Sequence, residues 1–178
     1  MIEDLSQPLD VSLLGGDGTE YRGTVALRQF ARLRAELTDA PGEVRVHLRF
    51  AHDESGRRLL NGELQTELAL TCQRCLQPMQ LPVNTAFRLA LLDPEDDPES
   101  LPASVEPVIV NNAQVNVLDL LEDELLLCLP IAPRHHADDQ CEAPQRRPGS
   151  TFGDVALDRQ NPFAVLRDLP FKQPPEKL

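Results

Sequence analysis

The hydrophobic pattern of this chain alternates residue by residue through much of its first half. A period of two is typical of a β-strand with one buried face. Short turns join three such stretches, which therefore predict an antiparallel meander with one face buried. They cover residues 43–50, 60–71 and 81–91. A further apolar run, residues 105–110, predicts an edge strand, because Pro107 has no backbone N–H to give to a central strand.

Two other segments have the spacing of amphipathic helices. The first predicted helix runs from Thr24 to Leu37, ahead of a Pro41-Gly42 stop signal. The second runs from Val117 to Leu129, with Asn116 as its N-terminal cap and Pro130 as its end. Leu118, Leu121, Leu125 and Cys128 share one face of this helix. Its three successive acids are expected to point outward: Glu122, Asp123 and Glu124.

These elements predict an α+β fold, in which a Leu-rich helix packs on an antiparallel β-meander sheet and an extended C-terminal tail follows. We expect residues 1–20 to be a loosely held N-terminal segment with at most one edge strand near residues 9–13. Residues 21–143 would form the domain, and residues 144–178 the tail. Within the tail, Asn161-Pro162 suits the start of a short helix over residues 161–168.

Charge is distributed unevenly along the chain. The net charge is −12, which as an average disfavours nucleic acid and anionic membranes. However, residues 22–92 carry ten Arg against seven acids, whereas residues 93–143 carry one Arg against thirteen acids. The bulk value therefore does not exclude a nucleic-acid role. No apolar run reaches the ~18 residues of a membrane span, and the acidic N-terminus does not resemble a signal peptide, so we expect a cytoplasmic protein without membrane contact.

Four cysteines are the main chemical signal. Cys72 and Cys75 form a C-x-x-C pair between two predicted strands, as in a zinc knuckle or a redox pair. A redox motif sits where a strand feeds a helix, and here Pro78 and another strand follow, so redox chemistry is disfavoured. Tetrahedral zinc needs two more ligands, and Cys141 with His135 or His136 could supply them. Cys128 falls on the buried face of the second helix and is interpreted as a core residue.

Catalytic signatures are lacking. We find no paired nucleophile and base, no glycine-rich phosphate loop and no pair of carboxylates in an apolar setting. Arginine supplies a nucleic-acid signal instead, since its planar fork suits phosphate. The best RNA footprint comprises Arg28, Arg32 and Arg34 of the first predicted helix together with Arg45, Arg49 and Arg74, and the last three are the candidates for direct contact. Tyr21 is the only Tyr, and aromatic residues do not interleave with arginine, so stacking of single-stranded bases is not supported.

Several of these pieces occur together in an order that resembles the YceD family of bacteria and plastids, described as large-subunit ribosomal RNA accumulation proteins. They are Asn61-Gly62-Glu63, Leu70 to Cys75, Asp119 to Leu127, Leu129 to His135, Cys141 and Asn161 to Leu166. The resemblance covers about residues 21–169 and implies a non-enzymatic cytoplasmic factor in the synthesis, processing or stability of large-subunit ribosomal RNA. The family's cysteine pair matches Cys72 and Cys75, and its later His and Cys match His135 and Cys141. The doublet with His136 leaves open which imidazole would bind a metal.

We therefore expect a ribosome-biogenesis factor that binds large-subunit ribosomal RNA, its precursor or an RNA–protein intermediate, with zinc fixing the tail to the sheet. Ribosomal or RNA-processing proteins are the expected protein partners, and no small-molecule substrate is expected. Two other classes remain open. One is a protein-interaction adaptor with structural zinc and no RNA contact. The other is a metal-dependent enzyme, which would need an open position on the zinc.

Overall fold

The computed structural model describes residues 5–12, 18–135 and 141. Five strands form one sheet in the order β2-β3-β4-β5-β6. Their bounds are β2 Glu20–Ala26, β3 Glu43–His52, β4 Arg58–Thr71, β5 Pro78–Leu92 and β6 Glu106–Ile109. Strands β2 to β5 pair antiparallel, and β6 joins the edge of β5 in parallel. The predicted α+β class and its meander, β3 to β5, are confirmed, and the edge strand lies at the predicted position.

A second, two-stranded sheet pairs β1, Leu9–Asp10, with β7, Gln114–Val115. The N-terminal segment is held more firmly than predicted, because Leu5 and Val11 are buried in the main core. The described residues belong to one compact unit, residues 1–144. The predicted tail and its helix over residues 161–168 lie outside the described residues, and the predicted domain boundaries stay predictions.

The first predicted helix was wrong in its extent. Residues from Thr24 to Ala26 belong to β2, a 3₁₀ turn η1 follows at Leu27–Gln29, and α1 covers only Ala31–Glu36. Of the four residues at helical spacing, Leu27 and Phe30 are buried, Leu37 is half-buried and Ala31 is exposed, while Leu33 is buried although the spacing did not select it. The alternation of β2 was hidden in the sequence because one of its inward positions, Gly23, has no side chain.

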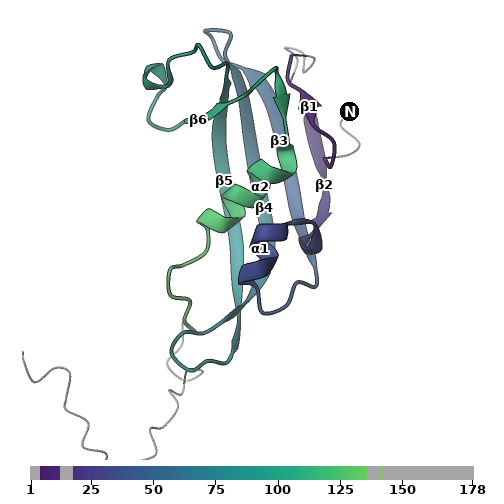
Figure 1. Cartoon of the computed structure of the whole chain (residues 1–178), viewed down its shortest axis with the longest axis vertical. Coiled ribbons are helices and arrows are strands. Elements are labelled where there is room, and N and C mark those ends of the chain that lie inside the picture. Colours follow the sequence, from purple (N-terminus) through teal and green to yellow (C-terminus); the bar gives the residue numbers. More distant parts are fainter. Residues whose placement is uncertain (1–4, 13–17, 136–140, 142–178) are drawn as a thin grey trace, which may run out of the picture. The chain divides into compact units, whose positions relative to one another are not determined.

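The second helix, α2, runs from Val117 to Leu127, two residues shorter than predicted. Asn116 occupies the cap position, but its side chain makes no capping hydrogen bond. Both α1 and α2 lie on the same face of the sheet (Figure 1). That face carries the buried side chains of the strands, among them Val46, Leu48 and Leu64.

Gly62 allows β4 and β5 to pack without a break. It lies opposite Phe87 in the register, and a Cβ at this position would overlap the Phe87 ring. Strand β4 continues through both Asn61 and Gly62.

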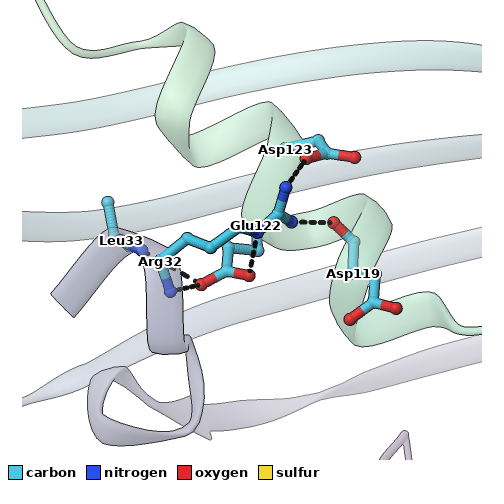
Figure 2. Close-up of polar contacts among 5 residues, drawn as sticks. All are labelled: Arg32, Leu33, Asp119, Glu122 and Asp123. Carbon is cyan, nitrogen blue, oxygen red and sulfur yellow. Dashed lines mark hydrogen bonds and ion pairs between the residues drawn. The ribbon is translucent and has the colours of Figure 1, made fainter. Parts of the chain in front are cut away.

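Glu122 corrects the prediction that the acids of α2 point outward. It is buried, at 5% exposure, and accepts hydrogen bonds from the backbone N–H groups of Arg32 and Leu33 at 2.6 and 3.0 Å (Figure 2). These N–H groups belong to the first turn of α1, which its own cap residue Phe30 cannot satisfy. The Arg32 guanidinium completes the contact, 2.8 Å from Glu122 and 2.7 Å from Asp123. A carboxylate of α2 therefore caps α1.

No helix in the described part of the chain is both long and apolar enough to cross a membrane.

Candidate functional site

The C-x-x-C turn joins β4 to β5 and is held by backbone hydrogen bonds. The N–H of Cys72 donates to the carbonyl of Gln77 at 2.9 Å, and the N–H of Leu76 donates to the carbonyl of Cys72 at 2.9 Å. Leu76 has a φ of 60°, which turns the chain back toward β5. Both cysteines are buried, so the turn presents two sulfurs inward rather than to solvent.

The segment after α2 returns to this turn. The N–H of Gln73 donates to the carbonyl of Pro133 at 2.8 Å, which brings His135 alongside the cysteines. The Sγ atoms of Cys72 and Cys141 lie 3.6 Å apart, and Cys75 Sγ lies 3.5 Å from Nδ1 of His135. One ligand atom from each of these four residues lies within 4.8 Å of the other three. His136 lies outside the described residues.

These distances fit a tetrahedral zinc ion. With Zn–S near 2.3 Å and Zn–N near 2.0 Å, tetrahedral angles separate two sulfurs by about 3.8 Å and a sulfur from a nitrogen by about 3.5 Å. Nε2 of His135 lies 3.2 Å from the carbonyl of Pro78, the usual partner for the imidazole N–H of a metal-bound histidine. Three cysteines and one histidine could therefore hold a metal ion such as zinc.

The thiols of Cys72 and Cys141 differ in how readily each loses its proton. Burial opposes ionisation of Cys72, but the backbone N–H groups of Cys75, Arg74 and His135 lower its pKa to about 5. Burial and contact with Cys72 and Cys75 raise the pKa of Cys141 to about 11. A buried thiolate beside a protonated thiol is an arrangement in which a bound cation would replace the proton.

Cys128 stands apart from this cluster. Its Sγ lies 3.2 Å from the carbonyl of Glu124, one turn earlier in the chain, and the residue is half-buried against the main core. This agrees with its predicted role as a core residue.

The face of the sheet opposite the helices is polar. In the register, Thr24, Arg45, Gln65 and Asn84 form one row across four strands. A second row, two residues along, contains Arg22, His47, Glu63 and Ala86, and a third contains Glu20, Arg49, Asn61 and Arg88. We call these twelve residues the outer face. A hollow of ≈830 Å³ includes the first row and extends beyond the outer face to residues such as Pro41, Glu67 and Gln80.

Arg45 and Arg49 both lie on the outer face and are exposed. Arg74 does not join them, because it lies in the C-x-x-C turn beyond the end of β4. Arg45 is opposite Gln65, and from there to Thr71 β4 extends for roughly 20 Å at ~3.3 Å per residue. Two further arginines on this face, Arg22 and Arg88, were missed, although the alternation of the strands could have placed Arg88.

Acidic groups limit the positive charge of the outer face. His47 lies between the carboxylates of Glu20 and Glu63, 3.8 Å from each. Arg22 pairs with Glu20 at 3.4 Å. In contrast, Arg45 has a neutral partner, since its Nη1 donates to Gln65 at 3.1 Å, and it makes no ion pair with any described residue.

The fold and the cysteine–histidine cluster define an α+β domain with a candidate metal site. We call this site, formed by Cys72, Cys75, His135 and Cys141, the clasp. Residues 60–170 match the model of the family described as "Large ribosomal RNA subunit accumulation protein YceD". The chain therefore belongs to the YceD family. A Haemophilus influenzae protein of that name is 29% identical over 152 residues, which cover 84% of this chain and 87% of the relative. No solved structure matches the chain.

Proposed function

We propose that this chain is a non-enzymatic cytoplasmic factor that supports the synthesis, processing or stability of large-subunit ribosomal RNA by binding that RNA or its precursor. Membership of a family named for accumulation of this RNA supports a role in its synthesis, processing or stability. The observation that carries the binding step is the outer face, because no described helix covers it and it presents Arg45, which no carboxylate of the described residues neutralises.

The chemistry of the outer face fits a phosphate backbone. Arg45 and Arg49 lie on one strand, four residues or roughly 13 Å apart, and Arg88 lies in the same row as Arg49. Amide side chains between them, Asn61 and Gln65, can donate to phosphate or sugar oxygens. Arg74, at the far end of β4, would contact a more distant part of a long RNA.

Zinc would have a structural role in this proposal. Four protein ligands close a tetrahedral site and leave no open position for a substrate or a reactive water. The ion would bind His135 and Cys141 to the C-x-x-C turn and so fix the segment after α2 against the sheet. This closed geometry favours a binding protein over a zinc enzyme.

A protein-interaction adaptor is the second candidate. The observation in its favour is the net charge of −12, with exposed acids such as Asp119 and Asp123 on α2. Such a surface suits a basic protein better than RNA.

The salt dependence of RNA binding distinguishes the RNA-binding factor from the protein-interaction adaptor. We expect the full chain to bind fragments of large-subunit ribosomal RNA with an affinity that falls as salt rises. Replacing Arg45 and Arg49 by Ala should weaken binding and lower the slope of log K against log salt by about 2, since each phosphate contact contributes about 1. Replacing Arg74 as well should lower the slope by about 1 more.

The matched control is Arg28→Ala with Arg34→Ala, which changes the net charge equally at two exposed residues outside the outer face. Binding that falls equally in both double variants would show only a bulk charge effect. No RNA binding at low salt, together with capture of ribosomal proteins, would favour the adaptor.

A further inference from the structure

One edge of strand β5 is paired with another strand over only part of its length. It is 15 residues long, but β6 pairs with only its last four residues, Leu89 to Leu92. On the other side, β4 pairs with β5 without interruption from Pro78 to Leu91. In the part of the chain that the structure describes, no strand pairs with the edge between Gln80 and Arg88.

The direction of the backbone groups follows from three hydrogen bonds. The carbonyl of Leu92 faces β6, because it accepts from the N–H of Val110 at 2.7 Å. The carbonyl of Pro78 lies 3.2 Å from the His135 ring, and Ala69, which lies opposite Gln80, directs its carbonyl away from β5 to the N–H of Thr38. Backbone groups alternate along a strand that has no bulge. The even-numbered residues of β5 therefore point away from β4.

This parity leaves a defined set of unused groups. Gln80, Asn84 and Ala86 each present an N–H and a carbonyl to the open edge, and Pro82 presents a carbonyl alone. The open stretch from Gln80 to Arg88 is nine residues, or about 30 Å at ~3.4 Å per residue. His135 bounds it at one end and β6 at the other.

The open edge has little of the usual protection against strand pairing. Natural proteins place charged side chains or proline on exposed edges. Between Gln80 and Arg88 the only charged side chain is that of Arg88, at the β6 end, and Pro82 is the only residue that interrupts the row of donors. On the helix-covered face, Leu81 and Phe87 are half-buried and would contact the alternate side chains of an added strand.

The charges beside β6 indicate which kind of side chain an added strand should carry at that end of the open edge. Glu106 pairs with Leu89, so it stands where an added strand would meet β6. Glu106 and Glu124 make no ion pair with any described residue. Burial raises the pKa of Glu124, and the nearby charges of Glu106 and Asp123 raise it further. These neighbouring acids favour a cation.

We propose that an extended segment of a partner protein, about nine residues long, adds as a strand to the open edge of β5 between His135 and β6. Its alternate residues are apolar, and a lysine or arginine at one end contacts Glu106 and Glu124. This is recognition by strand addition, in which main-chain hydrogen bonds supply affinity and alternate side chains supply specificity. This protein-binding edge does not include Arg45 or Arg49, although Asn84, Ala86 and Arg88 belong to the outer face as well.

The test uses the full chain and a synthetic peptide that alternates valine and threonine between two terminal lysines. Amide hydrogen exchange is measured by NMR with and without the peptide. In the free protein, the amides of Asn84 and Ala86 should exchange fast and those of Val83 and Thr85 slowly. The peptide should slow Asn84 and Ala86 by at least tenfold, and a peptide with terminal glutamates should bind more weakly.

Two variants locate the binding. Ala86→Pro removes one outward N–H without touching the ladder to β4 and should weaken peptide binding at least tenfold, while Ala86→Ser should bind as the wild type does. Methylating alternate peptide nitrogens gives the same test without altering the protein: one set should abolish binding and the other should not. Replacing Arg45 and Arg49 by Ala should leave peptide binding unchanged, which separates this proposal from RNA binding.

Three results would overturn it. The first is an absence of peptide-dependent protection at Asn84 and Ala86. The second is binding that is insensitive both to Ala86→Pro and to the pattern of methylation. The third is protection of these amides in the free protein. Such protection would show that a second copy covers the edge if it increased with concentration, or that the chain itself covers the edge if it did not.

Discussion

Glu122 is the only buried charged side chain in the part of the chain that the structure describes. Its carboxylate belongs to α2 and accepts hydrogen bonds from two backbone N–H groups in the first turn of α1. A carboxylate at a helix N-terminus also interacts favourably with the helix dipole. One side chain therefore joins two helices that are about ninety residues apart in sequence.

Replacing Glu122 by Ala should destabilise the fold by about 3 kcal/mol, because it removes several charge-assisted hydrogen bonds and leaves buried donors unpaired. Chemical denaturation of the full chain measures this. Asp123→Ala is the matched control: it removes an exposed partner of the same Arg32 and should cost under about 1 kcal/mol. Equal losses in the two variants would contradict the capping role.

The contribution of Glu122 should also depend on pH. Burial alone would raise its pKa, but hydrogen bonds from Leu33 and Arg32 outweigh burial and hold the pKa below its usual value of 4.5. A lowered pKa in the folded state means that the contribution is complete above the unfolded value and is lost as pH falls through the folded value. The difference in unfolding free energy between wild type and Glu122→Gln should therefore be constant near neutral pH and shrink below about pH 4.5. A difference that persists in acid would contradict this assignment.

Residue spacing predicted the metal cluster better than it predicted Glu122. Two cysteines separated by two residues in a turn can be recognised from the local sequence, and Cys141 with His135 or His136 was predicted to complete a candidate ligand set; the structure brings His135 and Cys141 close to the pair. Helical periodicity, in contrast, correctly placed Leu121 and Leu125 on the buried face of α2 but cannot show that Glu122 meets α1. That information is not local, since it depends on how the two helices cross the sheet.

At the scale of elements, alternation predicted β3, β4 and β5 because each has a long row of mostly apolar side chains on one face. Strand β2 was missed since Gly23 interrupts its row and the helical spacing of Leu27 and Phe30 overlaps its end. The parallel direction of β6 could not be predicted either. It depends on the path of residues 93–105, which carry no periodic signal.

The clasp formed by Cys72, Cys75, His135 and Cys141 joins two elements, the β4–β5 turn and the segment after α2. We predict about one zinc ion per chain in protein purified without added zinc. Removing the ion with a chelator should lower the melting temperature by at least about 5 °C, because metal binding contributes directly to folding.

Substitutions should assign the ligands. Cys141→Ser and His135→Ala should lose the zinc, whereas Cys128→Ser and His136→Ala should keep it. Metal analysis by mass spectrometry measures the content. Four free thiols, no metal and unchanged stability in chelator would reject the clasp, and loss of zinc in His136→Ala alone would transfer the imidazole ligand to His136.

At the scale of the molecule, opposite faces of one sheet carry different chemistry. Arginine and amide side chains occupy the outer face, and the acids of α2 lie on the helix-covered side. This separation explains how a chain with a net charge of −12 can present a local surface suited to phosphate. The open edge of β5 borders both faces, so RNA and a protein strand could bind together.

The most direct test of RNA binding is ultraviolet cross-linking in living cells, followed by sequencing of the attached RNA and mass spectrometry of the attached peptides. We predict cross-links concentrated on large-subunit ribosomal RNA or its precursor, located in peptides from β3 and β4. They should fall strongly in the Arg45→Ala, Arg49→Ala variant but not in the Arg28→Ala, Arg34→Ala control. Cross-links spread evenly over cellular RNA, or confined to proteins, would contradict the account.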